Sequence, residues 1–332
     1  MFDYHLPKEL IAQYPFKKRD KARLMVLNRN KGEIKENIFN EITEYFEEGD
    51  TLVLNDSKVI PARLRGKKNT GGKIEIFLLR KTQPYIWEVL IRGNIKQKQE
   101  CEVIKENRKL SLKILERTAT GSYIIEFPTD KESEIFNFGE IPLPPYIKRK
   151  PEKEDDIFYQ TVYGKKEGSV AAPTAGLHFT NPLLGKIENK GINITYITLH
   201  IGWASFKILR DTEKEVGEEF IEISEEASKI INKTKKEKRR VIAVGTSTVR
   251  TLESSVKEGR IIPSCGYTDL FIKPGFKFKI VDALITNFHL PGSTHLLLVC
   301  AFGGTHFIEK AYKIAIEKKY RFYSYGDAML IV

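Results

Sequence analysis

Cysteine is scarce in this 332-residue chain, and its spacing excludes the sites that cysteines usually build. The three cysteines, Cys101, Cys265 and Cys300, form no CxxC pair and leave an odd count. This usage argues against a disulfide framework or a cysteine zinc site and indicates a reducing compartment. The six histidines form no HExxH motif, and the pair His289 and His295 has no third ligand nearby. We therefore predict no metal site.

Long apolar segments and glycine-rich phosphate loops are also missing. The longest apolar run near the C-terminus, 296–302, is too short to cross a bilayer. Asp3, Lys8 and Glu9 interrupt the stretch that a signal peptide needs to be apolar. We expect a soluble, cytoplasmic protein without membrane contact. The motifs GxGxxG, GxxxxGK[ST] and GxSxG do not occur, which disfavours a Rossmann dinucleotide site, a P-loop and a nucleophile elbow.

Basic residues are in excess, and most of the excess falls in one segment. The chain has 55 Lys and Arg against 44 Asp and Glu, a net charge of +11. Residues 62–151 alone hold 19 basic and 11 acidic residues, so this segment carries +8 of the total. Such a balance favours an acidic partner such as nucleic acid, another polyanion or a phosphorylated ligand. A basic enzyme that is merely soluble would show the same total charge.

The hydrophobic pattern changes at both ends of this basic segment. Within 62–151 apolar and polar residues alternate in short runs between glycine turns, which is typical of an antiparallel sheet or small barrel. Outside it, buried-strand candidates alternate with helical patterns. We predict strands at 51–55 and 241–245, a helix over 38–49, a helix from Thr180 to Gly191, and a helix capped by Ser224.

The expected fold class is α/β. Residues 1–61 and 152–332 would form a discontinuous α/β catalytic domain, interrupted by an inserted basic antiparallel β-barrel domain at 62–151.

The segment GSVAAPTAGLHFT (168–180) is rich in small residues and has the composition of a ligand-binding loop. Small side chains let a backbone approach a ligand closely, and the hydroxyls of Ser169 and Thr174 can donate hydrogen bonds. His178 follows them with an ordinary pKa suited to proton transfer. The alternative is a tight structural loop whose histidine is satisfied internally.

The segment VIAVGTSTVRTLES (241–254) combines a buried strand, one glycine and the start of a helix. Thr246, Ser247 and Thr248 open that helix, whose free N–H groups favour an anion. Arg250 lies one turn further on and could grip a carboxylate through two parallel hydrogen bonds. Ordinary helix capping next to a surface arginine would produce the same pattern.

Two segments further along the chain carry candidate pocket residues. Asn287, His289, Ser293 and His295 crowd around Pro-Gly just before an apolar helix, as at a pocket rim between strand and helix, although His295 could simply start that helix. YRFYSYGDAML (320–330) places Arg321 among four aromatic residues. Such a cluster can stack bases beside a cation, or it can be core packing near a C-terminus.

Five segments together resemble one known family, the S-adenosylmethionine:tRNA ribosyltransferase-isomerases of queuosine biosynthesis. They are LVLNDSKVIPARLRG (52–66), YQTVYGKKEGSVAAPTAGLHF (159–179), GTSTVRTLES (245–254), LFIKPGFKFKIVDALITNFHLPGSTHLLLVCAF (270–302) and YRFYSYGDAMLI (320–331). The resemblance runs from Phe2 to Ile331. It implies an α/β domain with an inserted β-barrel, in agreement with the pattern change above.

The resemblance also implies an activity and its substrates. The ribosyl portion of S-adenosylmethionine would be transferred to the aminomethyl group of a 7-deazaguanine in the tRNA anticodon, giving epoxyqueuosine and releasing adenine and methionine. The partners would be tRNA and S-adenosylmethionine, with no further cofactor, and we expect a monomer. The chain departs from the family at LHIGWASF (199–206), where Ala204-Ser205 replace a usual Gly-Thr pair, and at VGEE (216–219). There Gly217 stands where the family has a histidine, while Glu219 is kept.

The chemistry of this cosubstrate suggests roles for the candidate residues. Arg250 and the turn at 246–248 would bind the methionine carboxylate, and Asp269 or Asp282 would accept hydrogen bonds from the ribose diol. The sulfonium activates the neighbouring ribose carbon, so the reaction needs a base for its proton and an acid for adenine rather than a metal. His178 and His289 are the leading pair.

Two other functions explain part of the sequence. A non-catalytic RNA-binding protein would account for the basic segment but not for the small-residue loop or the histidine turns. An ordinary S-adenosylmethionine-dependent methyltransferase would be expected to carry a glycine-rich loop after its first strand, which is missing here.

Overall fold

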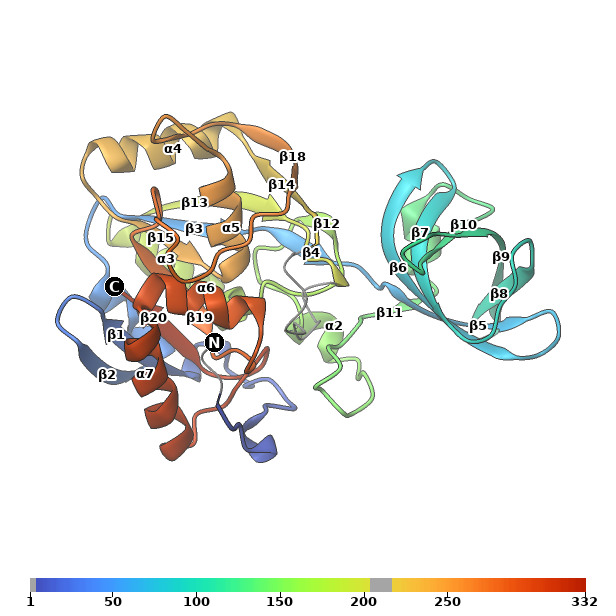
Figure 1. Ribbon diagram of the computed structural model, residues 1–332, viewed down its shortest axis with the longest axis horizontal. Helices are drawn as coiled ribbons and strands as arrows, with labels where there is room; N and C mark the ends of the chain where they lie inside the picture. Colours follow the sequence, from blue (N-terminus) through green and yellow to red (C-terminus); the bar gives the residue numbers. More distant parts are fainter. Residues whose placement is uncertain (1–3, 204–216) are drawn as a thin grey trace.

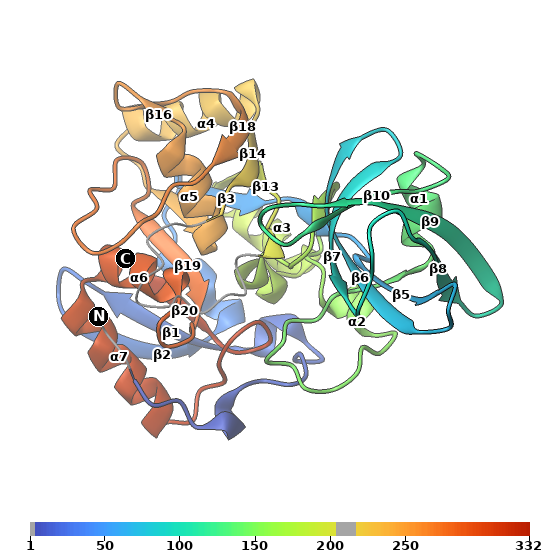
Figure 2. The same cartoon turned by 45° about the vertical axis from the view of Figure 1, so that its right-hand side comes forward.

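The structure is a computed structural model that describes residues 4–203 and 217–332. It has an α/β part and a β-barrel set to one side of it (Figures 1 and 2). The predicted fold class, mixed α/β with an inserted antiparallel barrel, is confirmed. None of the helices in the described ranges is long and apolar enough to cross a membrane.

The α/β part is built on a nine-stranded mixed sheet. Its order is β18-β14-β13-β3-β15-β19-β20-β1-β2. The four central strands, β13, β3, β15 and β19, run parallel, so that their carboxyl ends share one edge. The strands are β1 (Arg23–Asn28), β2 (Glu33–Ile38), β3 (Thr51–Asn55), β13 (Asn193–Leu199), β14 (Glu219–Ile223), β15 (Val241–Val244), β18 (Ser264–Thr268), β19 (Ala283–Asn287) and β20 (Ala328–Ile331).

Both faces of this sheet are buried, because successive side chains of each strand point to opposite faces. In β3, Val53 belongs to one hydrophobic cluster, while Leu52 and Leu54 belong to the other. The first cluster includes side chains of α4 (Glu225–Lys236), α5 (Thr246–Ser254), α6 (Thr294–Gly303) and α7 (Thr305–Glu317). The second includes side chains of α3 (Asn181–Asn189). The α/β part is therefore a three-layer sandwich.

Local sequence signals predicted most of these elements correctly. The Thr180 hydroxyl accepts the N–H of Leu183 at 3.3 Å and starts α3. The Ser224 hydroxyl accepts the N–H of Ala227 at 3.1 Å and starts α4. The strands predicted at 51–55 and 241–245 are β3 and β15. These elements are confirmed because capping and apolar runs are local properties.

The helix predicted over 38–49 is wrong in type and extent. Ile38 ends strand β2, which pairs with β1 in a hairpin, and only Phe39–Tyr45 forms a 3₁₀ helix. The apolar side chains Phe39 and Ile42 still face the core. The spacing therefore predicted burial correctly, and strand pairing decided the backbone conformation.

Six antiparallel strands close into the barrel. They are β5 (Arg63–Lys68), β6 (Lys73–Gln83), β7 (Ile86–Arg92), β8 (Glu100–Lys105), β9 (Arg108–Arg117) and β10 (Tyr123–Glu126). Closure comes from the β5–β8 pairing, at which Gly66 is required because a Cβ there would lie 2.3 Å from the carbonyl oxygen of Glu102. The short strand β11 (Gly139–Glu140) adds to β5, and α1 (Glu132–Phe136) precedes it. The barrel has its own hydrophobic core.

Apolar contacts join the barrel to the α/β part. The ring of Trp203, just beyond β13, lies 4.6 Å from that of Phe77 in β6, and Val170 packs into the barrel core. Strands β4 (Ser57–Val59) and β12 (Lys166–Ser169) pair between the two parts (Figure 1). At the far end of the inserted segment, Ile141 and Ile147 pack with aromatic side chains of the α/β part.

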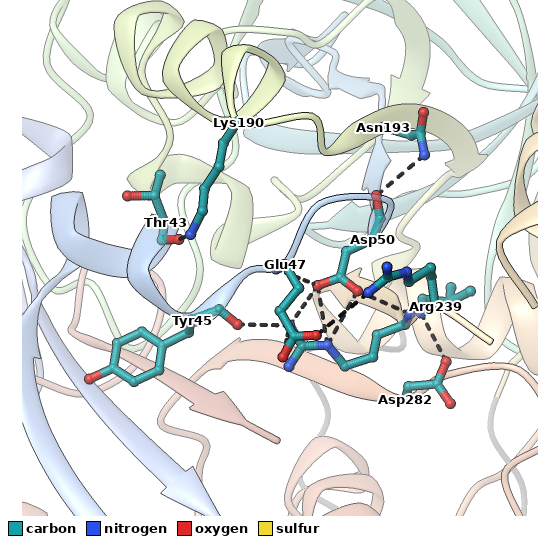
Figure 3. A network of polar contacts seen from close by, with 10 residues as sticks. Thr43, Tyr45, Glu47, Asp50, Lys190, Asn193, Arg239 and Asp282 are labelled. Carbon is teal, nitrogen blue, oxygen red and sulfur yellow. Dashed lines mark hydrogen bonds and ion pairs between the residues drawn. The ribbon is translucent and has the colours of Figure 1, made fainter. Parts of the chain in front are cut away.

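The amino ends of the central strands are tied together by a polar network (Figure 3). The buried carboxylate of Asp50, just before β3, accepts the backbone N–H of Arg240 at 3.0 Å and its Nη2–H at 2.6 Å. The Asp282 carboxylate, just before β19, binds Lys235 Nζ at 2.7 Å and the N–H of Val241 at 2.8 Å. These ion pairs hold the edge of the sheet that lies opposite the carboxyl ends.

Candidate active site

A cavity lies at the carboxyl edge of the parallel strands, where α/β sheets generally bind ligands. It encloses about 920 Å³ of empty space, part of which is open to solvent. The residues that line it lie far apart in the sequence: Tyr146, Tyr159, Ile201, Glu219 and members of the stretches 171–175, 245–250, 286–295 and 323–324. The cavity thus gathers residues from all four segments that the sequence marked as candidate binding or catalytic segments.

The N-terminus of α5 opens into this cavity without a side-chain cap. Its first residue follows Gly245, whose φ of 91° is strained for residues other than glycine. The N–H of Gly245 bonds to the carbonyl of Ile285 at 2.8 Å, which fixes the turn. Thr246 and Ser247 line the cavity, and Ser247 Oγ accepts Asn55 Nδ2–H at 3.2 Å. The free N–H groups of a first turn attract an anion.

A buried ion pair forms one wall. Arg250 Nη1 donates to Glu219 Oε2, and both side chains line the cavity. Arg250 Nε also donates to the Leu270 carbonyl at 2.9 Å, and Nη2 lies 3.4 Å from the Thr268 carbonyl. Glu219 Oε1 accepts the N–H of Gly202 at 2.9 Å. Arg250 is 9% exposed, so it is not the surface arginine of the alternative interpretation.

Two stacked histidines also line the cavity. The rings of His289 and His295 lie 5.3 Å apart with planes 18° from parallel. His289 Nε2 is 2.7 Å from Thr286 Oγ1, and its backbone N–H donates to the Tyr312 hydroxyl at 2.9 Å. Burial, together with the neighbouring His295, holds the pKa of His289 well below its ordinary 6.5. Burial and the nearby Arg250 lower the pKa of His295 to about 4. Both rings are therefore neutral at pH 7.

Aromatic residues form a further part of the cavity wall. Tyr146 and Tyr323 stack with ring centroids 4.5 Å apart, and the Tyr146 hydroxyl lies 2.5 Å from Ser324 Oγ. Tyr323 has a φ of 72°, an uncommon backbone conformation that is concentrated at functional sites. Its buried hydroxyl has no hydrogen-bond partner within the described part of the chain.

His178 lies behind the cavity, in a small second hollow. It ends the 3₁₀ helix formed by Thr174–His178, and its Nε2 is 3.2 Å from Asn287 Nδ2. Asn287 Oδ1 in turn accepts the Thr174 hydroxyl at 3.0 Å, and both of these residues line the main cavity. Burial lowers the pKa of His178 to about 4. The two predicted catalytic histidines therefore lie in different hollows, and only His289 lines the main one.

Some of the predicted binding residues line the main cavity and others do not. Thr174, Thr246, Ser247, Arg250 and Ser293 line the cavity together; Ser293 also caps α6 through the N–H of Leu296 at 3.2 Å. Five others do not line it: Ser169, Thr248, Asp269, Asp282 and Arg321.

Each of these five has a different place. The hydroxyls of Ser169 and Thr248 donate to backbone carbonyls, at 2.7 Å in both cases. Asp269 is exposed beyond β18, and Asp282 lies at the opposite edge of the sheet, paired with Lys235. Arg321 stacks on Phe16 beside the second hollow, and the four aromatic residues around it are buried in the core.

Sequence reasoning did not select three cavity residues: Tyr146, Tyr159 and Tyr323. Tyr146 lies in a proline-rich segment that reads as a hinge, and long-range packing brings it to Tyr323. The buried, Tyr-rich sequence around 320–325 was the available signal. Of the departures from the family pattern, Ala204 and Ser205 lie outside the described residues, and Gly217 is exposed two residues before Glu219.

Metal-ligating side chains are dispersed. Within residues 4–203 and 217–332, no three His, Cys, Asp or Glu side chains are grouped closely enough to hold a metal ion. His289 contacts Thr286, and its ring stacks on that of His295.

Comparisons with known proteins place the chain among proteins of tRNA modification. The family described as "Queuosine biosynthesis protein" matches residues 1–331. An S-adenosylmethionine:tRNA ribosyltransferase-isomerase of Sulfurihydrogenibium sp. is 50% identical over 100% of this chain and 98% of its own length. One from Thermotoga petrophila is 49% identical over the same shares. The crystal structure of S-adenosylmethionine tRNA ribosyltransferase from Thermotoga maritima is 40% identical, with a TM-score of 0.59 over 100% of this chain and 99% of that one.

Proposed function

Because the chain belongs to the family of queuosine biosynthesis proteins, we propose that the cavity beside α5 is the active site of its ribosyltransferase-isomerase reaction. The enzyme transfers the ribosyl portion of S-adenosylmethionine to 7-aminomethyl-7-deazaguanine in tRNA and isomerises it, giving epoxyqueuosine and releasing adenine and methionine. The observation that supports the location is the meeting of an uncapped helix N-terminus, a buried arginine and a neutral histidine in one cavity.

The methionine carboxylate binds at the N-terminus of α5 in this proposal. The first N–H groups of the helix and the hydroxyls of Thr246 and Ser247 face the cavity, and an anion there is favoured by the helix dipole. Arg250 uses three of its five N–H donors within the protein, which leaves donors for the same carboxylate. Glu219 keeps the guanidinium in place and compensates its charge when the site is empty.

The adenine lies against the stacked pair Tyr146 and Tyr323. Aromatic faces suit a flat purine, and the buried hydroxyl of Tyr323 is a donor without a partner in the described ranges. Ser324, whose Oγ is 2.5 Å from the Tyr146 hydroxyl, lies beside them on the cavity wall.

His289 takes the proton from the ribose carbon next to sulfur. The sulfonium acidifies that carbon, and a base must be neutral to accept its proton. The lowered pKa keeps the His289 ring neutral across the physiological range, and Thr286 orients it at 2.7 Å. His178 contacts Asn287 from behind and acts as a positioning residue for Asn287 and Thr174.

The barrel contributes charge for the tRNA. Its surface has a hollow lined by Arg65, Lys67, Lys73, Arg92 and Glu75, and Arg65 also pairs with Glu140 at 3.1 Å. Salt-dependent phosphate contacts of this kind supply much of the affinity of proteins for nucleic acids. The barrel contacts the α/β part through Phe77 and Trp203, and Trp203 follows the cavity residue Ile201 by two positions, so we infer that the same tRNA reaches both.

We further propose that the reaction uses S-adenosylmethionine as cosubstrate without a resident cofactor, because the sulfonium itself activates the ribose carbon. We also propose that the protein is a cytoplasmic monomer. Sedimentation at micromolar concentration distinguishes a monomer from a dimer.

Incubation with ribose-labelled S-adenosylmethionine and tRNA carrying the 7-aminomethyl base tests the function. The expected result is label in the tRNA, with equal amounts of free adenine and methionine. Formation of S-adenosylhomocysteine would show methyl transfer instead. Binding of both substrates with no released product would show a binding protein.

A further inference from the structure

Three arginine–aromatic pairs lie side by side around the second hollow, next to the cavity. The guanidinium carbon of Arg19 lies 5.4 Å from the ring centroid of Phe158, and that of Arg321 lies 4.2 Å from the ring of Phe16. The third pair is Arg149 over Tyr14 at 4.4 Å. The aromatic side chains come from the N-terminal segment and from α2 (Asp155–Phe158), which lies between the α/β part and the barrel in Figures 1 and 2.

Arg19 and Arg321 form no direct ion pair with a carboxylate of the described residues, although the charge of nearby Asp327 acts on Arg321. Arg19 donates to the carbonyls of Gln160 and Ile157, at 2.6 Å in both cases, and Arg321 Nη2 donates to the carbonyl of Tyr14. Asp327, the acidic residue next to Arg321, accepts the backbone N–H of Arg321 instead of its guanidinium. Arg149, in contrast, is neutralised by Asp155 through two bonds of 2.6 Å.

Half-buried guanidinium groups whose hydrogen bonds within the described residues go to neutral carbonyls are unusual, because buried charges are normally paired directly. The carbonyls and rings fix both guanidinium groups in place, so little side-chain entropy remains to be lost when an anion binds. The surroundings also suit RNA, since Tyr14 is 53% exposed and Ile157 is 69% exposed on the same surface. Fixed cations interleaved with accessible apolar and aromatic groups are the pattern of single-stranded nucleic-acid sites.

The second hollow and the cavity share one lining residue. Phe16, Arg19, Phe158 and His178 line it, and Ser324 lines both the hollow and the cavity. A nucleotide whose base occupies the cavity therefore has its backbone within reach of this surface.

We propose that Arg19 and Arg321 bind phosphates of the tRNA next to the base being modified, so that this surface, rather than the barrel alone, places the nucleotide at the cavity. The inference rests on the function proposed above. In this proposal the α/β part contacts the anticodon nucleotides, and the barrel binds more distant phosphates. The methionine carboxylate is the competing anion, and the test separates the two.

The test compares Arg19→Gln and Arg321→Gln with Arg29→Gln as a matched control. Arg29 is also half-buried, stacks on Phe302 at 4.1 Å and donates to two backbone carbonyls, but it lies at the Asp282 edge of the sheet. Affinity for the tRNA is measured by anisotropy at several salt concentrations, the KM for S-adenosylmethionine by adenine release, and folding by thermal unfolding.

Each hollow-side variant should weaken tRNA binding by about tenfold or more and lower the slope of log affinity against log salt by about 0.7–0.9. The KM for S-adenosylmethionine and the behaviour of Arg29→Gln should be unchanged. An unchanged tRNA affinity and slope in both folded variants would overturn the proposal. A raised KM for S-adenosylmethionine with unchanged tRNA affinity would overturn it in favour of the carboxylate. In either case tRNA-dependent adenine release by the unsubstituted protein would still establish the function itself.

Discussion

Replacing Arg250 by alanine should affect both cosubstrate binding and folding, and the structure allows the two effects to be separated. The guanidinium has N–H donors left after its bonds to Glu219, Leu270 and Thr268. A charge-assisted bond to the methionine carboxylate is worth about 1.5–3 kcal/mol, so the KM for S-adenosylmethionine should rise about 10- to 150-fold. Initial rates of adenine release at saturating tRNA measure this KM.

The same substitution breaks the ion pair between Arg250 and the Glu219 carboxylate, which is 4% exposed. Breaking such a pair from one side costs about 3–5 kcal/mol of unfolding free energy. Adding Glu219→Gln removes the negative charge of that side chain while an amide oxygen still accepts the N–H of Gly202. The double variant should therefore regain much of its stability but keep the raised KM.

Arg240 provides the control, because it forms a comparable ion pair with buried Asp50 at the other edge of the sheet. Arg240→Ala should lower stability and leave the KM unchanged. A cosubstrate analogue without the carboxylate should bind the wild type and the double variant about equally. If the double variant has the wild-type KM, or still discriminates against the analogue as the wild type does, Arg250 does not bind the carboxylate.

Three further outcomes follow from the geometry. His289→Gln should cut turnover by about a hundredfold or more with little change in the KM. Because the pKa of His289 is well below 6.5, titration of this ring should not raise wild-type turnover between pH 6 and 8. A rise through pH 6–7 that the variant abolishes would contradict this. Combined alanine substitutions of Arg65, Lys67 and Arg92 should lower the salt slope of tRNA binding by about 0.7–0.9 per lost phosphate contact, and an unchanged slope would remove the barrel from the binding surface. Asp50→Asn should lower the unfolding free energy, measured by urea denaturation, by about 2–3 kcal/mol. This is less than for a fully buried pair, because Arg240 still reaches water. An unchanged urea midpoint would mean that the network of Figure 3 adds no net stability.

The fold was predictable where the sequence pattern is local. Alternation identified the barrel, and the caps at Thr180 and Ser224 identified two helix starts. The backbone conformation of segment 38–49 was not predictable, because pairing of β2 with β1 overrides a helical spacing of apolar residues. Strand order decides such cases, and it depends on residues far apart in the chain.

The candidate site was predictable in part for the same reason. Thr246, Ser247 and His289 stand at strand-to-helix turns, which local sequence reveals, and they meet in the cavity. Asp282 directly precedes β19, which ends two residues before His289, so only the direction of β19 places Asp282 at the far edge. His178 and Tyr146 depend on loop packing, which places the first behind Asn287 and brings the second to Tyr323.

A crystal structure with an unreactive S-adenosylmethionine analogue, in which a carbon replaces the sulfonium, tests the location of the active site most directly. We predict that its carboxylate lies within hydrogen-bond distance of the backbone N–H groups of Thr246 and Ser247, with the ribose carbon facing His289. An analogue bound instead in the hollow beside His178, or on the barrel, would contradict this location.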